Sequence, residues 1–154
     1  MYVLVLLFMS VLAIVILLVT EIMRIHTIAA HVETEMSRAI NIAVETAIDD
    51  TWRIDMGKDL GSETANVMDI TVAKSDFNSY LYKSIGLTKT SSYPETYTLY
   101  SGGKPLYRIE LAINATSVPP YFEASGTVYI RSLFTFIAKE AQVPFRIRSR
   151  NKRI

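Results

Sequence analysis

The sequence has 154 residues, half of them apolar, a net charge of +1 and no cysteine. Without cysteine, disulfides, thiolate zinc sites, iron–sulfur clusters and c-type haem attachment are excluded. The near-neutral total hides an asymmetry, because residues 1–76 carry eleven acidic and five basic side chains and residues 77–154 carry four acidic and eleven basic ones.

The first 56 residues contain neither glycine nor proline and predict one continuous helix over residues 1–56. Residues 1–20 are almost wholly apolar, interrupted by Ser10, and suit the roughly 30 Å hydrocarbon core of a bilayer. No lysine or arginine precedes Arg24, and no small-residue cleavage site follows closely. We therefore expect the segment to be retained, unlike a signal peptide. From the missing basic flank we expect, as a hypothesis the sequence does not decide, that a leader is removed before Met1.

Beyond the apolar segment the predicted helix becomes an amphipathic stalk over residues 21–56. Its apolar side chains recur in steps of three and four, which places them on one face. The residues predicted to form a helix-packing seam are Val5, Leu12, Val15, Ile22, Ile25, Ala29, Val32, Met36, Ala39 and Ala43. The stalk part of this seam fits packing either on the chain's own head or on copies of the same helix. Asp49 and Asp50 oppose the helix dipole, so we expect the helix to end within Trp52–Met56.

A short strand and a short helix are predicted near the start of the head. Val67–Val72 contains β-branched residues and is the predicted strand. Ser75 or Asp76 is expected to cap a helix over Phe77–Ile85. Gly86 follows that helix and is expected to end it in the left-handed conformation.

The rest of the head, which is predicted to span residues 57–154, is rich in strand signals. Gly57–Asn66 is predicted to be a loop and Thr88–Glu95 a polar connection. Ser101–Lys104 has two central glycines, which is typical of a β-hairpin turn. The predicted strands are Tyr97–Tyr100, Leu106–Ala115, Ser125–Phe136 and Val143–Ile154. We expect an α+β fold in which three to five antiparallel strands pack against the C-terminal half of the long helix.

Charged residues of the stalk and of the last strand are candidates for contacts between copies. Arg146, Arg148 and Arg150 alternate with uncharged residues, so one face of that strand is cationic. Such a face can contact phosphate, but it also protects a sheet edge, and nucleic acid is not expected as a partner beside a membrane anchor. The charge asymmetry fits attraction within one molecule or between the stalk of one copy and the head of another. The inter-subunit candidates are Glu21, Arg24, Glu33, Asp49, Asp50, Arg146, Arg148 and Arg150.

The sequence offers little chemistry for catalysis. His26 and His31 are five residues apart, about 140° around a helix, and so do not form the i, i+4 pair of a helical metal site. The hydrolase, phosphate-loop and zinc-protease motifs are missing. We expect no enzyme activity, cofactor, metal or small-molecule substrate. Asn114 begins an Asn-Ala-Thr sequon, a candidate glycosylation site if the head lies outside a cell.

The layout of the chain resembles the type IV pilin superfamily, and within it the Tad-like pilins and pseudopilins. The resemblance covers an apolar helix half beginning at residue 1, an amphipathic half near Ile22–Trp52 and a small β-rich head; Val5 stands where the family usually has a glutamate. It implies that prepilin peptidase clips a leader, that subunits wait in the inner or cytoplasmic membrane, and that the pilus assembly machinery polymerises them with their helices bundled.

The expected function is that of a structural subunit of an extracellular, pilus-like filament at the cell surface, with copies of itself as partners. Residues 1–20 would lie in the membrane before assembly and in the filament core afterwards. Two alternatives stay open. One is a membrane-anchored minor pseudopilin of a secretion or pilus machine, and the other is a membrane-tethered binding module that uses the basic C-terminal strand.

Overall fold

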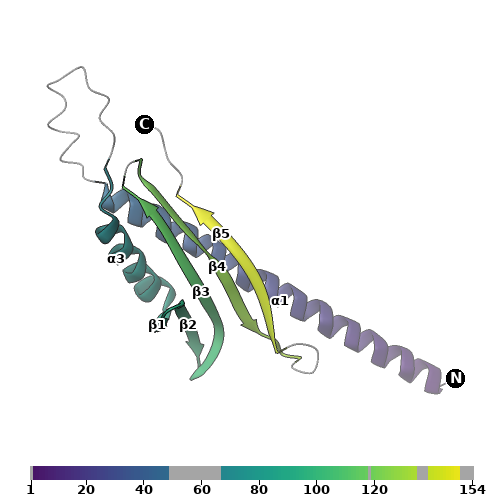
Figure 1. Ribbon diagram of the computed structural model, residues 1–154. Coiled ribbons are helices and arrows are strands. Elements are labelled where there is room, and N and C mark those ends of the chain that lie inside the picture. The colour runs from purple at the N-terminus through teal and green to yellow at the C-terminus, as the bar shows by residue number, and fades with distance from the viewer. Residues whose placement is uncertain (1, 49–66, 118, 135–138, 150–154) are drawn as a thin grey trace, which may run out of the picture.

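The computed structural model describes residues 2–48, 67–117, 119–134 and 139–149, so the predicted loop Gly57–Asn66 lies outside the described residues. The helical elements are α1 (Tyr2–Ala47), α3 (Ile70–Tyr80) and the π-helical turn η2 (Leu81–Ile85). The strands are β1 (Thr88–Ser92), β2 (Glu95–Ser101), β3 (Lys104–Thr116), β4 (Tyr121–Arg131) and β5 (Glu140–Arg148). This arrangement of a long helix on an antiparallel sheet confirms the predicted α+β fold (Figure 1).

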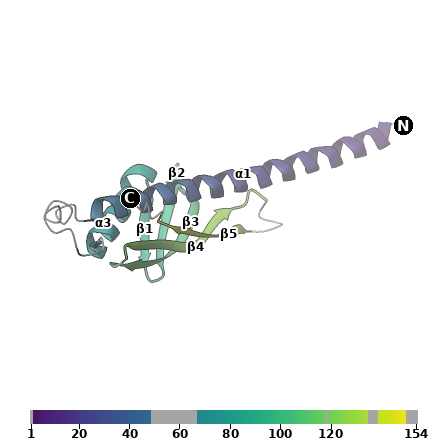
Figure 2. The same cartoon turned by 90° about the horizontal axis from the view of Figure 1, so that it is seen from above.

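Helix α1 has 46 residues and is about 70 Å long. Its C-terminal half packs against α3, β4 and β5, and its N-terminal half projects beyond the head (Figure 2). The predicted end within 52–56 is wrong, because α1 ends at Ala47. There Ile48 pairs with Met68 in an isolated β-bridge, and the Asp69 N–H donates to the Ala47 carbonyl at 3.0 Å. Backbone pairing with the segment before α3 therefore replaces the next helical turn.

Helix α3 begins earlier than the sequence predicts. Asp69 is its N-cap and its carboxylate accepts hydrogen bonds from the Thr71 and Val72 N–H groups, at 2.8 and 3.2 Å. The predicted strand Val67–Val72 is therefore wrong, and so is the predicted helix start near residue 77. Local capping has overridden the strand preference of the β-branched residues. The predicted end is confirmed, because Gly86 has φ +79° at the C-cap of η2.

The five strands of the described sheet are antiparallel and lie side by side in chain order. Gly102 and Gly103 both have positive φ in the hairpin between β2 and β3, as the turn signal predicted. The predicted polar connection Thr88–Glu95 instead contains β1, an edge strand whose five residues are all exposed. No burial pattern marks such a strand in a sequence, which explains the error.

Strands β4 and β5 both start before their predicted positions, and β4 ends at Arg131, earlier than predicted. The predicted continuation of the last strand over 150–154 lies outside the described residues. The backbones of the paired strands β3 and β4 come especially close at Gly126, where an added Cβ would lie 1.8 Å from the Glu110 carbonyl oxygen. A glycine inside a strand weakens the strand signal, although here it marks close backbone approach. On β5, Ile147 is buried between exposed Arg146 and Arg148, so the predicted alternation is confirmed over the described residues.

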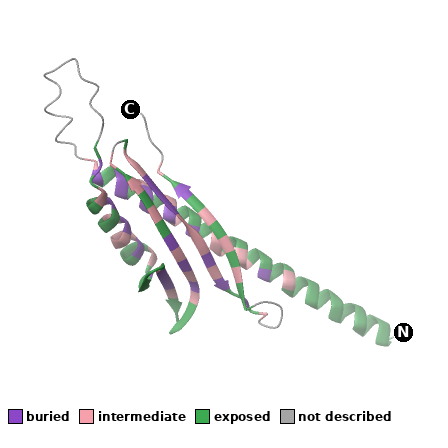
Figure 3. Ribbon diagram, viewed as in Figure 1, coloured by how far each residue is buried: buried purple, intermediate pink, exposed green. Residues whose placement is uncertain are grey.

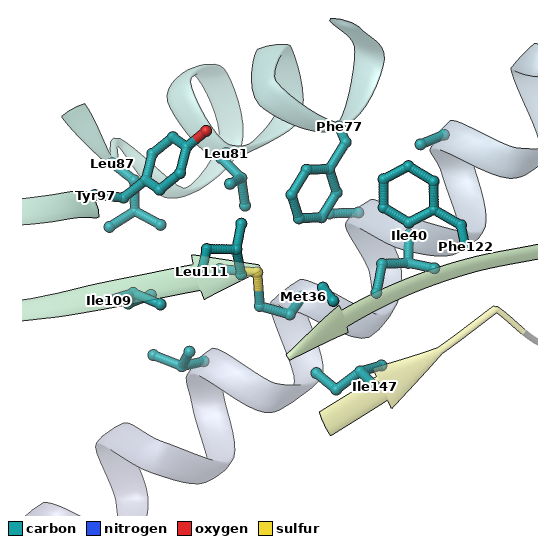
Figure 4. Close-up of a cluster of buried hydrophobic side chains, with 14 of the residues drawn as sticks. Met36, Ile40, Phe77, Leu81, Leu87, Tyr97, Ile109, Leu111, Phe122 and Ile147 are labelled. Carbon is teal, nitrogen blue, oxygen red and sulfur yellow. The ribbon is translucent and has the colours of Figure 1, made fainter. Parts of the chain in front are cut away.

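One core joins α1, α3 and the inner face of the sheet (Figure 3). The rings of Phe77 on α3 and Phe122 on β4 lie 5.3 Å apart, and Met36 of α1 is fully buried beside them (Figure 4). Ala39 and Ala43 are also fully buried, and their small side chains allow the helix to lie close to the head. The stalk is thus one wall of the core of the head.

Replacing Phe77 by alanine tests this core. We expect Phe77→Ala to lower the free energy of unfolding by about 3–5 kcal/mol, because it leaves a cavity against Phe122. Urea denaturation of the full chain in detergent micelles measures the loss. Val72→Ala on the exposed side of the same helix is the control, with an expected change within about 0.5 kcal/mol. Equal losses for the two variants would contradict the assigned core.

Candidate functional site

The apolar segment at residues 2–20 is the most unusual surface of the molecule. Its side chains are exposed on nearly all sides of the helix, including the predicted seam residues Val5, Leu12 and Val15. Within the described residues, α1 is the one helix long and apolar enough to cross a membrane, and the head buries none of its apolar window. A signal sequence near an N-terminus meets the same two criteria of length and composition.

The remaining seam residues divide into an exposed end and a buried end along α1. Ile22 is 65% exposed, and Ile25 and Ala29 are half-buried. The buried members are Val32, Met36, Ala39 and Ala43, all of which lie in the core of the head. For this C-terminal part of the seam, the structure shows packing on the chain's own head.

Glu21 is buried where the apolar segment gives way to the stalk, with only 6% of its surface exposed. The Nε and Nη2 groups of Arg24 each donate a hydrogen bond to one of its carboxylate oxygens at 2.9 Å. The Leu133 N–H donates to the same carboxylate at 2.9 Å, and Arg24 Nη2 also donates to the Arg131 carbonyl at 2.7 Å. This junction pair, Glu21 with Arg24, therefore joins the helix to the turn after β4.

The electrostatics of the junction pair favour the ionised state. Hydrogen bonding from Arg24, opposed by burial and supported by the Leu133 N–H, lowers the pKa of Glu21 from 4.5 to about 2. The same contact raises the pKa of Arg24. The sequence alone identifies the two residues as neighbours on a helix, three positions apart. Their third partner is 112 residues further along the chain, and no sequence signal announces it.

The cationic face of β5 is neutralised in part by the neighbouring strand. Arg146 Nη2 lies 3.0 Å and Arg148 Nε 2.6 Å from the carboxylate of Glu123 on β4. Hydrogen bonding from Arg146 and then from Tyr121 lowers the pKa of Glu123 to about 2. Arg150 lies outside the described residues. The two described arginines thus share an acidic partner within the head, although both stay more than half exposed.

Ion pairs between described residues do not join the acidic half of the chain to the basic half. Each pair joins two residues within 1–76 or two within 77–154. Glu33 is exposed on α1 and has no ion pair among the described residues. Asp49 and Asp50 lie outside them. Over this part of the chain, ion pairs with the head therefore do not neutralise Glu33.

A groove of about 650 Å³ lies between α1 and the β2–β3 hairpin, with apolar walls such as Leu106 and a polar end. At the polar end, Glu35 forms an ion pair with Arg38 at 2.8 Å and accepts a hydrogen bond from the Tyr80 hydroxyl at 3.1 Å. The Tyr107 hydroxyl is buried without a hydrogen-bond partner in the described part of the chain. Burial, with a smaller contribution from Glu35, raises the pKa of Tyr107 to about 12. The phenol is therefore neutral at physiological pH and unsuited to act as a base.

Other candidate sites from the sequence lie apart from one another. His26 and His31 are exposed on α1, and the described residues contain no group of histidine and carboxylate side chains that could hold a metal ion. Asn114 is exposed on β3. Its sequon is thus accessible on the surface.

Comparison with known proteins gives no relative. No protein-family model, curated protein or solved structure matches the chain. The resemblance to type IV pilins therefore stays a prediction that depends on the layout of the chain, while the α+β fold with its apolar N-terminal helix is established by the structure.

Replacing Glu21 by glutamine tests the junction pair. We expect Glu21→Gln to weaken the contact with the Leu133 N–H and to increase hydrogen exchange at that amide by about tenfold, because the acceptor loses its charge. Hydrogen–deuterium exchange of the full chain in micelles measures the change. Glu33→Gln, an exposed site on the same helix, is the control. Unchanged exchange at Leu133 would show that the contact does not hold the turn.

The pKa of Glu21 also predicts a pH dependence. Because its pKa is lower in the folded state than its usual value, the carboxylate stabilises the fold fully above about pH 4.5. That stabilisation is lost as the pH falls from 4.5 toward 2. We expect the difference in urea midpoint between the native chain and Glu21→Gln to be constant from pH 7 to 5 and to disappear near pH 2. A difference that has already vanished at pH 5 would contradict the ion pair.

Proposed function

We propose that this chain is a structural subunit of a pilus-like filament, held in a membrane by residues 2–20 before assembly and by the same segment in a helix bundle afterwards. One observation carries the proposal. An apolar segment exposed on all sides continues without a break into a stalk that is built into the head. A helix that is apolar all round requires an apolar environment, which lipid or neighbouring helices can supply.

The few polar side chains of the segment support this assignment. The Ser10 hydroxyl donates to the Leu7 carbonyl and the Thr20 hydroxyl to the Ile16 carbonyl, each at 2.8 Å. Both are thus satisfied within the helix, and neither hydroxyl needs water as a partner. The segment can move from lipid to a helix bundle without leaving either hydroxyl unpaired. Assembly would then depend on close packing, because it exchanges one apolar environment for another.

The stalk supplies further surface for contacts between copies. Ile22 and Met23 are both 65% exposed directly after the apolar segment, and Glu33 is an exposed acid beyond them. In the proposed filament the apolar pair extends the helix contact, and the stalk acids face basic residues of a neighbouring head. Charge complementarity of this kind fixes register more than it adds affinity. By resemblance, prepilin peptidase and the pilus assembly machinery are the proposed partners, the filament lies at the cell surface, and no enzyme activity or cofactor is proposed.

A minor pseudopilin that stays anchored and does not form a homopolymer is the second candidate, since it needs the same apolar segment. The binding-module alternative has less support. The two described arginines of its cationic face, Arg146 and Arg148, are paired with Glu123 inside the head. Because one carboxylate neutralises part of their charge, this face has less net charge to offer a phosphate backbone.

Single cysteines distinguish a filament from an anchored monomer, because the native chain has none. We expect Leu12→Cys to give disulfide-linked dimers in oxidised material sheared from cells, together with filaments by negative-stain microscopy. Val72→Cys, on the exposed side of α3, is the control and should give far fewer dimers. Exclusively monomeric Leu12→Cys in the membrane fraction, with no filaments, would favour the anchored pseudopilin.

A further inference from the structure

We propose that the turn after β4 is a second membrane contact, which lies in the headgroup region beside the helix. The contact surface consists of Ile22 and Met23 on α1 with Leu133 of the turn, flanked by basic Arg131 and Lys139. The inference rests on the membrane anchor of the proposed function and adds its orientation. It names the lipid surface of that same membrane as the partner of the head.

The depth of this surface follows from the helix. Residues 2–20 span about 28 Å at 1.5 Å per residue, close to the roughly 30 Å of a bilayer's hydrocarbon core. Glu21, the first charged residue, therefore lies at the boundary between hydrocarbon and headgroups. The Leu133 N–H is bonded to its carboxylate at 2.9 Å, which places the turn at the same depth. In Figures 1 and 2 the β4–β5 end of the sheet lies beside the point where α1 leaves the head.

The chemistry of the surface suits a membrane interface. The Leu133 backbone is held by the buried carboxylate of Glu21, yet 69% of the residue is exposed. In water, exposure of this apolar side chain gives no stabilisation. Ile22 and Met23 are similarly exposed at the same level of the helix. Arg131 and Lys139 are exposed, and the sequence between them contains no charged residue. Apolar side chains flanked by basic ones fit the boundary between acyl chains and anionic headgroups.

Lipid is favoured over a second copy because the surface is continuous with the membrane-compatible segment. The basic residues also match the negative charge of a lipid surface. A helix alone does not set the tilt of the head relative to the membrane. Contact at a second point, off the helix axis, sets that tilt and turns one side of the head toward the bilayer. Each subunit would then present its stalk and head to neighbours in one orientation.

Depth-dependent quenching tests the proposal on the full chain. Leu133→Cys carries one fluorophore, because the native chain has no cysteine, and the protein is reconstituted in vesicles of phosphatidylcholine and phosphatidylglycerol. A fraction of the lipids carries a spin label near the headgroup. Val72→Cys is the matched control, an exposed apolar residue on α3 at the other end of the stalk. About 40 Å of helix separates Glu21 from Ala47, near which α3 begins. A fluorophore on Leu12→Cys reports whether the apolar segment at residues 2–20 lies in the bilayer.

We expect the label at Leu133 to be quenched at least about twofold more than the label at Val72, with the label at Leu12 shielded from aqueous quenchers. Equal quenching at Leu133 and Val72, with Leu12 shielded, would overturn the turn contact and leave the anchor intact. A label at Leu133 that is shielded from water but not quenched by lipid would mean that a second copy covers the turn, which also overturns the proposal. A label at Leu12 open to water would overturn the anchor and the turn contact together.

Discussion

The structure depends on an apolar helix segment that its own chain does not cover. Residues 2–20 expose apolar side chains around the whole circumference, and the sheet lies too far along α1 to reach them. Burial of apolar surface is the main favourable contribution to folding and association, so this segment drives the molecule into lipid or against other helices. The satisfied hydroxyls, the unbroken helix and the charge-free stretch up to Glu21 are all consistent with that one requirement.

The same helix serves two environments because its composition changes at Glu21. Beyond this residue, apolar positions narrow to a stripe, and from Val32 to Ala47 the stripe becomes part of the core of the head. Neither glycine nor proline interrupts α1, so the helix lacks the two residue types that most often kink a helix. The apolar segment and the core of the head therefore share one uninterrupted helix.

The elements with periodic burial could be predicted from the sequence. The stalk of the long helix and the alternation around Ile147 show regular patterns of apolar and polar residues, and two glycines mark the hairpin at Gly102–Gly103. The errors occurred where burial gives no pattern, as in exposed β1, or where one side chain decides locally, as Asp69 does at the start of α3. The contact between Glu21 and Leu133 could not be predicted, because it joins a helix to a turn 112 residues away.

The Glu21–Arg24 pair lies where the apolar segment meets the charged stalk, and its role is better understood as positional than as stabilising. Removing two charges from water opposes their attraction, so a buried pair adds little net stability over an apolar replacement. A pair at this position instead marks where the apolar segment ends. By holding the Arg131 carbonyl and the Leu133 N–H, it also fixes how the sheet is rotated about the helix. In a filament built from parallel copies of such a helix, the rotation of each head decides which residues face the next subunit. A buried carboxylate at the end of the apolar segment thus couples that segment to the geometry of any assembly that forms from it.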